Sequence, residues 1–100
     1  EVLDLPSTPT LSDGTAGGVE IGSITFDYCR DYVDDYVDVS EDELIEGLRI
    51  FIDDTNYIGE GAVGVAVAGY LKQKTKWVGK KVAIIACGGN ISRNTLKEIL

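Results

Sequence analysis

The stretch VAIIACGGN, Val82 to Asn90, decides the fold, because an apolar run stops there at a cysteine, two glycines and an amide. An apolar run from Lys81 to Ala86 is typical of a strand whose two faces are covered by helices in a parallel sheet. The helical pattern ISRNTLKEIL follows directly, so the sequence predicts a strand over 81–87 and a helix over 92–100. Open α/β sheets hold ligands at such strand ends, although paired glycines also serve a simple tight turn.

Other patterns upstream predict the rest of the architecture. Ser40 with Glu43 three residues later forms a capping box, and apolar residues then recur at helical spacing. The run EGAVGVAVAGYLKQ is apolar nearly all round and rich in small residues, which indicates a buried, closely packed helix. The predicted elements are a loop over 1–18, a helix over 23–33, a short strand over 36–39, and helices over 41–54 and 60–74. Strands that alternate with helices predict an α/β fold: part of a three-layer open sheet of parallel strands covered by helices.

Composition restricts the class of protein. One hundred residues make one domain at most, and a net charge of -8 argues against binding to a nucleic-acid backbone. Two distant cysteines without histidine fit neither a disulfide framework nor a zinc site, so a reduced, cytoplasmic location is expected. No apolar stretch is long enough to cross a membrane. The chain opens on Glu1 and closes on Leu100 within a helical pattern, which suggests a fragment of a longer protein.

Few residues are candidates for chemistry, and each has a structural alternative. Cys87 is either a ligand contact or a small buried hydrophobe, and Gly88 either admits a ligand or allows a turn. Glu60 lies between two glycines; it either favours a helix N-terminus or faces a polar ligand. Asp13, next to Gly14, is typical of a turn. The other acidic pairs are interpreted as solvated, and no metal site is predicted.

Four segments together resemble a known family. PTLSDGTAGGVEIGSITF, VDDYVDVSEDEL, IGEGAVGVAVAGYL and VAIIACGGNIS occur in the order and spacing of the C-terminal part of serine/threonine dehydratases. These are pyridoxal-phosphate enzymes of the tryptophan synthase β-like fold (fold type II), and serine racemase is related to them. The resemblance covers residues 10–100, nearly the whole chain.

The resemblance implies roles for four residues at the cofactor. Family members close the site with a loop that Ser12-Asp13-Gly14 matches, which implies that Gly14 contacts the cofactor. They place a carboxylate near the pyridine ring where Glu60 stands. They also end a strand on Ser or Cys followed by Gly-Gly-Asn, so Cys87 would face the ring nitrogen and Gly88 would lie beside it.

The resemblance also implies what this sequence lacks. The Schiff-base lysine and the glycine-rich phosphate loop of the family lie upstream and are absent here, so no catalytic residue is predicted and the chain alone should be inactive. The implied parent is a homo-oligomeric ammonia-lyase that converts L-threonine or L-serine to a 2-oxo acid and ammonia. Alternatives are a serine racemase or hydroxyaspartate ammonia-lyase type relative, or a non-catalytic regulatory or interaction module.

Overall fold

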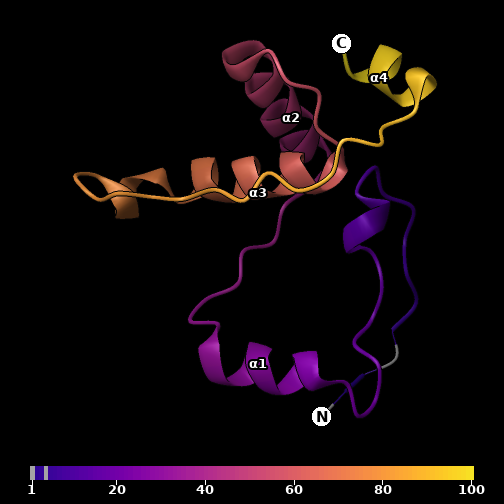
Figure 1. Cartoon of the computed structure of the whole chain (residues 1–100), viewed down its shortest axis with the longest axis vertical. Helices are drawn as coiled ribbons and strands as arrows, with labels where there is room; N and C mark the ends of the chain where they lie inside the picture. The colour runs from indigo at the N-terminus through magenta and orange to yellow at the C-terminus, as the bar shows by residue number, and fades with distance from the viewer. Residues whose placement is uncertain (1, 4) are drawn as a thin grey trace.

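The structure, a computed structural model, describes residues 2, 3 and 5–100. Its described residues contain four α-helices and two short 3-10 helices and no strand. In chain order these are η1 (Asp13–Thr15), α1 (Ile24–Tyr32), α2 (Glu41–Thr55), α3 (Gly61–Lys72), η2 (Lys74–Trp77) and α4 (Arg93–Ile99) (Figure 1).

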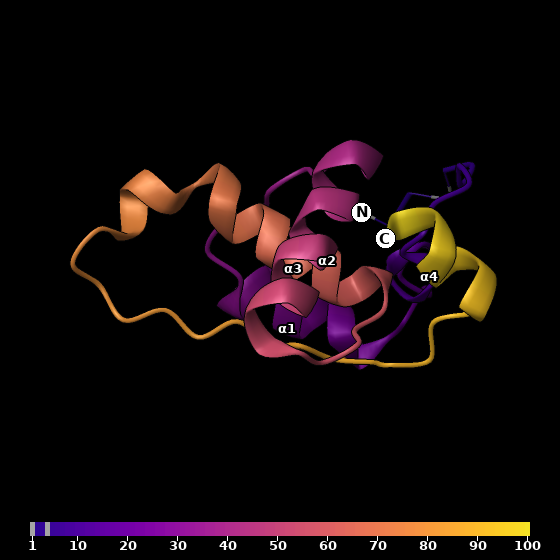
Figure 2. The same cartoon turned by 90° about the horizontal axis from the view of Figure 1, so that it is seen from above.

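Helices α2 and α3 pack closely and form the centre of the molecule (Figures 1 and 2). Glycines on each helix allow this approach: a Cβ at Gly47 would lie 2.6 Å from the Gly64 carbonyl oxygen, and one at Gly64 would lie 2.6 Å from the Leu44 carbonyl oxygen. The core contains Leu48, Val63, Val67 and Ile99, all buried. Small residues at the crossing therefore let two backbones meet, as the composition of 60–74 predicted.

Hydrogen bonds at the helix ends fix where α2 and α4 begin. Ser40 accepts the Glu43 N–H and Glu43 accepts the Ser40 N–H, which confirms the predicted capping box. Ser92 caps α4 by accepting the Thr95 N–H at 3.0 Å. The Arg49 side chain of α2 donates to the carbonyl oxygen of Ile99, so α4 is tied to α2 although a long loop precedes it.

The predicted sheet does not form among the described residues. Segments 36–39 and 81–87 are open chain, and no backbone hydrogen bond joins them to each other. A strand needs a neighbour that pairs with its N–H and C=O groups. Segment 81–87 instead runs exposed along α3 (Figure 1). Neither segment forms a strand in the described chain, so the predicted sheet stays a prediction.

Helix α1 lies apart from the α2–α3 pair, and none of its residues is buried (Figure 1). Ser23 begins it by accepting the Thr25 N–H, and Arg30 pairs with Asp27 and Asp31 on its surface. These local contacts stabilise the helix itself. They provide no packing against the rest of the described molecule.

Candidate functional site

The N-terminal end of α3 brings together Glu60, Gly88 and Gly14, three of the four residues that the resemblance predicts at the cofactor. Glu60 is the residue before the first turn of α3, yet its side chain accepts no hydrogen bond from that turn. Its carboxylate instead accepts the Asn90 N–H at 3.1 Å, and its own N–H donates to the Gly88 carbonyl oxygen at 3.4 Å. The carboxylate therefore points away from α3 and toward the segment 88–90.

Gly88 requires a glycine for two reasons. Its φ is +89°, in the left-handed region where a side chain is strained. A Cβ there would also lie directly against the Glu60 carboxyl group, 2.7 Å from its Cγ. The glycine thus makes room for Glu60. Gly89 differs, because its added Cβ would meet nothing closer than the Ile58 carbonyl oxygen at 3.4 Å.

Gly14 approaches the same carboxylate from the N-terminal loop. A Cβ at Gly14 would lie 3.7 Å from Oε1 of Glu60, in ordinary van der Waals contact. The preceding Ser12 is buried, and its hydroxyl shares a hydrogen bond with Thr15 across η1. The loop lies close to α3 because Gly61 has no side chain: a Cβ there would lie 2.6 Å from the Ser12 Cα.

Cys87 precedes Gly88 in the chain and carries a free, exposed thiol. It is therefore not a buried core cysteine in the described chain. Cys87 directly precedes the segment 88–90, whose backbone forms hydrogen bonds with Glu60. Asn90 was not among the four assigned residues; its N–H contributes to the site through the backbone, which side-chain chemistry does not reveal.

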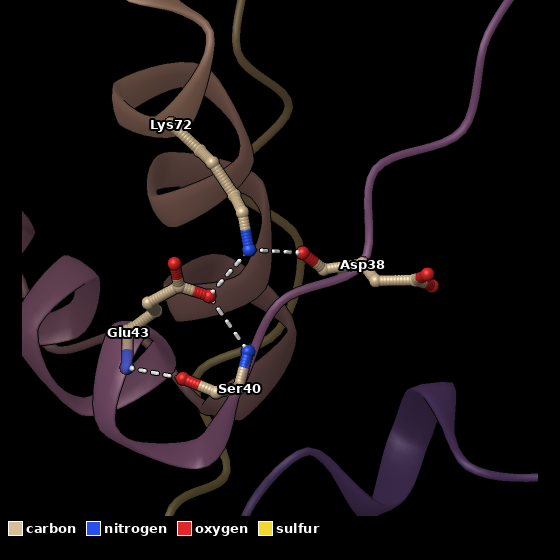
Figure 3. A network of polar contacts seen from close by, with 4 residues as sticks. All are labelled: Asp38, Ser40, Glu43 and Lys72. Carbon is tan, nitrogen blue, oxygen red and sulfur yellow. Dashed lines mark hydrogen bonds and ion pairs between the residues drawn. The ribbon is translucent and has the colours of Figure 1, made fainter.

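A second polar network, at the other end of α3, fixes the segment before α2 (Figure 3). Lys72 donates to Oε2 of Glu43 at 2.9 Å and to the Asp38 carbonyl oxygen at 2.8 Å. The pKa of Glu43 lies below its ordinary value, mainly because its carboxylate accepts the Ser40 N–H and secondly because it pairs with Lys72. The sequence signalled only the capping box, because the partner lysine lies 29 residues further along the chain.

The residues at the N-terminal end of α3 fit one side of a pyridoxal-phosphate site. Gly14 and Gly88 lie against the Glu60 carboxylate there, and Cys87, with its exposed thiol, directly precedes Gly88 in the chain. Glycine permits close approach of a ring. Lys72, at the opposite end of α3, pairs with Glu43, and Lys76, in η2 beyond that end, pairs with Asp35. That end lies about 18 Å away along a twelve-residue helix, so these lysines do not belong to the cluster.

The described part of the chain contains neither a cluster of potential metal ligands nor a helix suited to a bilayer. No group of three or more histidine, cysteine, aspartate or glutamate side chains there could hold a metal ion. None of the helices in residues 2, 3 and 5–100 has both the length and the apolar character needed to cross a bilayer.

Comparison with known proteins gives related enzymes of amino-acid metabolism. The chain is 39% identical over 92 residues to an L-threonine ammonia-lyase of Thermotoga maritima, which covers 92% of the chain and 22% of the relative. It is 33% identical over 90 residues to an L-threo-3-hydroxyaspartate ammonia-lyase of Saccharomyces cerevisiae, covering 90% and 27%. It is 31% identical over 105 residues to a serine racemase of Oryza sativa subsp. indica, covering 100% and 30%.

The chain thus spans less than a third of the length of these three relatives. No solved structure matches it. The sequence family described as pyridoxal-phosphate dependent enzyme matches residues 1–88, which include Gly14, Glu60, Cys87 and Gly88. The chain therefore belongs to the family of pyridoxal-phosphate dependent enzymes.

Proposed function

We propose that this chain forms one wall of the cofactor site of an ammonia-lyase that acts on L-threonine or L-serine. The observation that carries the proposal is the convergence of Gly14 and Gly88 on the carboxylate of Glu60, next to the exposed thiol of Cys87. Similarity to an L-threonine ammonia-lyase over 92% of the chain supports the reaction class.

Each side chain has a specific task in this proposal. Pyridoxal phosphate, when bound, acts as an electron sink for the substrate amino acid. Cys87 would hold the ring nitrogen with a neutral thiol, which does not force a proton onto it as a carboxylate would. Gly14 would allow the ring to approach the backbone, and Gly88 would leave room for the Glu60 carboxylate. Glu60 would remain beside the ring on the Asn90 N–H. With such a neutral partner, the cofactor would supply a weaker electron sink, which suits loss of the β-hydroxyl of the substrate.

The covalent anchor and the phosphate-binding loop would come from another part of the complete enzyme. Residues 36–39 and 81–87 would then gain the strand partners that they lack in the described chain, which completes the α/β sheet. The free thiols of Cys29 and Cys87 are compatible with the cytoplasmic location included in this proposal. The chain by itself would have no activity.

The test is the substrate profile of the complete enzyme with pyridoxal phosphate. We expect 2-oxo acid and ammonia from L-threonine or L-serine, and a visible absorption band from the bound cofactor. Preferential turnover of L-threo-3-hydroxyaspartate, or racemisation of serine, would favour a second candidate, since relatives with those names match at 33% and 31% identity. A protein that binds no pyridoxal phosphate would instead be a non-catalytic module.

A further inference from the structure

We propose that Glu41 is a positioning residue for the cofactor wall, because its carboxylate holds the segment 10–12 that leads into the turn carrying Gly14. The inference rests on the proposed function and adds a residue that acts at a distance, from the first turn of α2. Glu41 does not touch the cluster around Glu60. It acts through the loop.

Both carboxylate oxygens of Glu41 are used by this loop, 30 residues earlier in the chain. Oε1 accepts the hydroxyl of Thr10, and Oε2 accepts the Leu11 N–H at 3.0 Å. The pKa of Glu41 lies below its ordinary value of 4.5, mainly because of the hydrogen bond from the Thr10 hydroxyl and secondly because of the Leu11 N–H. The side chain is therefore ionised at neutral pH, when both contacts are strongest.

The anchored segment continues directly to the cluster. The Ser12 N–H donates to the Thr10 hydroxyl oxygen at 3.1 Å, so the same hydroxyl links Glu41 to the buried serine. Gly61, the first residue of α3, lies against Leu11 and Ser12 from the other side. The loop is thus held between the first turns of α2 and α3, two residues before Gly14 approaches Glu60.

The neighbouring acidic residues of α2 provide an internal control. Glu43 is occupied by the Ser40 N–H and Lys72. Asp42 makes no hydrogen bond or ion pair with the described residues, yet it carries the same charge in the same helical turn. Replacement of Asp42 therefore reproduces the effect on the helix dipole and leaves the loop contacts in place.

The experiment compares Glu41→Gln, Thr10→Val and Asp42→Asn in the complete enzyme. Amide hydrogen exchange over residues 10–15 is measured in the apoenzyme, and the dissociation constant is measured with pyridoxal phosphate itself. Glu41→Gln and Thr10→Val should each speed exchange in this segment and leave exchange in α2 unchanged. Each should weaken cofactor binding roughly tenfold, the lower end of the loss seen at metal sites when a partner that orients a ligand is removed. Asp42→Asn should change neither quantity.

A coupling measurement separates positioning from general loss of stability. Because Glu41 and Thr10 share one contact, the double variant should weaken cofactor binding by less than the product of the two single effects. Suppose that the wild type binds the cofactor and that Glu41→Gln matches Asp42→Asn in both exchange and cofactor affinity. That result would overturn the positioning role of Glu41 and leave the proposed function standing. A wild type that binds no pyridoxal phosphate would overturn the proposed function, and with it the cofactor role of this loop.

Discussion

Cys87 is the residue whose chemistry most directly tests the cofactor wall. In the complete enzyme, Cys87→Ser should be mild, since a hydroxyl is also a small, neutral partner. Cys87→Ala should reduce turnover more, because the ring nitrogen would lose its partner at a cost of about 1–3 kcal/mol. Cys87→Asp should reduce elimination most, because a carboxylate favours the protonated nitrogen. The measurement is turnover together with melting temperature for all three variants. If Cys87→Ala kept full turnover while Cys87→Ser lost activity, Cys87 would have only a packing role.

Gly88 tests the geometry around Glu60 without any cofactor. Gly88→Ala should lower stability by about 1–2 kcal/mol, the typical cost of a side chain in left-handed backbone. It should also displace Glu60 from the Asn90 N–H, because the new methyl group would occupy the position of its carboxyl group. Gly89→Ala is the matched control, since it has more room and no positive φ. Thermal melts of the two variants in the complete enzyme check this, and equal destabilisation would contradict the described turn.

At the scale of elements, the α2–α3 crossing depends on small residues. Gly64→Ala should push the helices apart, since its Cβ would lie 2.6 Å from the Leu44 carbonyl oxygen and 3.1 Å from the Leu48 Cβ. We expect a loss of about 1–3 kcal/mol, as for overpacking in a core. Gly69→Ala on the same helix has nothing within 4 Å of its Cβ, and should be neutral or stabilising by helix propensity. Urea denaturation of both variants measures the difference; a Gly64 variant as stable as the Gly69 variant would exclude a close crossing.

The start of α2 predicts a pH dependence of stability. The Ser40 N–H and Lys72 lower the pKa of Glu43 in the folded state, so the unfolded state takes up the proton first as the pH falls. The contribution of Glu43 to stability is therefore complete above the unfolded value near 4.5 and is lost as the pH falls through the lower folded value. Glu43→Gln should melt earlier than wild type at neutral pH and approach it in acid. Asp42→Asn serves as the control and should show no such convergence.

The sequence predicts elements that depend on neighbouring residues better than elements that need a distant partner. Ser40 and Glu43 marked the start of α2 because a capping box needs only residues three apart, and the structure contains it. The small apolar residues of α3 indicated close packing for a similar reason. The run 81–87 was predicted as a strand from its apolar side chains, but a strand depends on a hydrogen-bonded neighbour. Periodicity cannot say whether that neighbour is present.

The candidate site shows the same division. Glu60 is a candidate from the sequence because it is a carboxylate between two glycines. Its partner, the Asn90 N–H, is a backbone group 30 residues away, and no local pattern signals it. The same holds for Glu41, whose contacts with Thr10 and Leu11 span 31 and 30 residues. Contacts of this kind become visible only when the fold brings distant backbone together.

The whole molecule is more open than an independent domain of its length. Its radius of gyration is 14.7 Å, against about 13 Å for a compact domain of 100 residues. Large apolar side chains remain exposed on α1 and on the segments between helices, including Ile21, Ile24, Tyr32, Tyr57, Val78 and Ile85. The apolar segment 81–87 beside α3 has backbone groups without hydrogen-bond partners among the described residues. Exposed extended chain of this kind readily pairs with other chains. These exposed apolar surfaces therefore have the character of a protein interior, as the proposed function expects of one wall of a larger enzyme.

This openness predicts how the isolated 100-residue chain behaves in solution. Exposed apolar side chains and unpaired backbone along 81–87 should cause the chain to self-associate, or to form a loosely packed state that binds an apolar dye. Light scattering, dye fluorescence and thermal melting measure this, with the complete enzyme as the control in the same buffer. The complete enzyme should bind less dye per residue and melt cooperatively, because its own segments would cover these surfaces. A monomeric isolated chain with a sharp melt and no dye binding would show instead that these 100 residues form a self-sufficient domain.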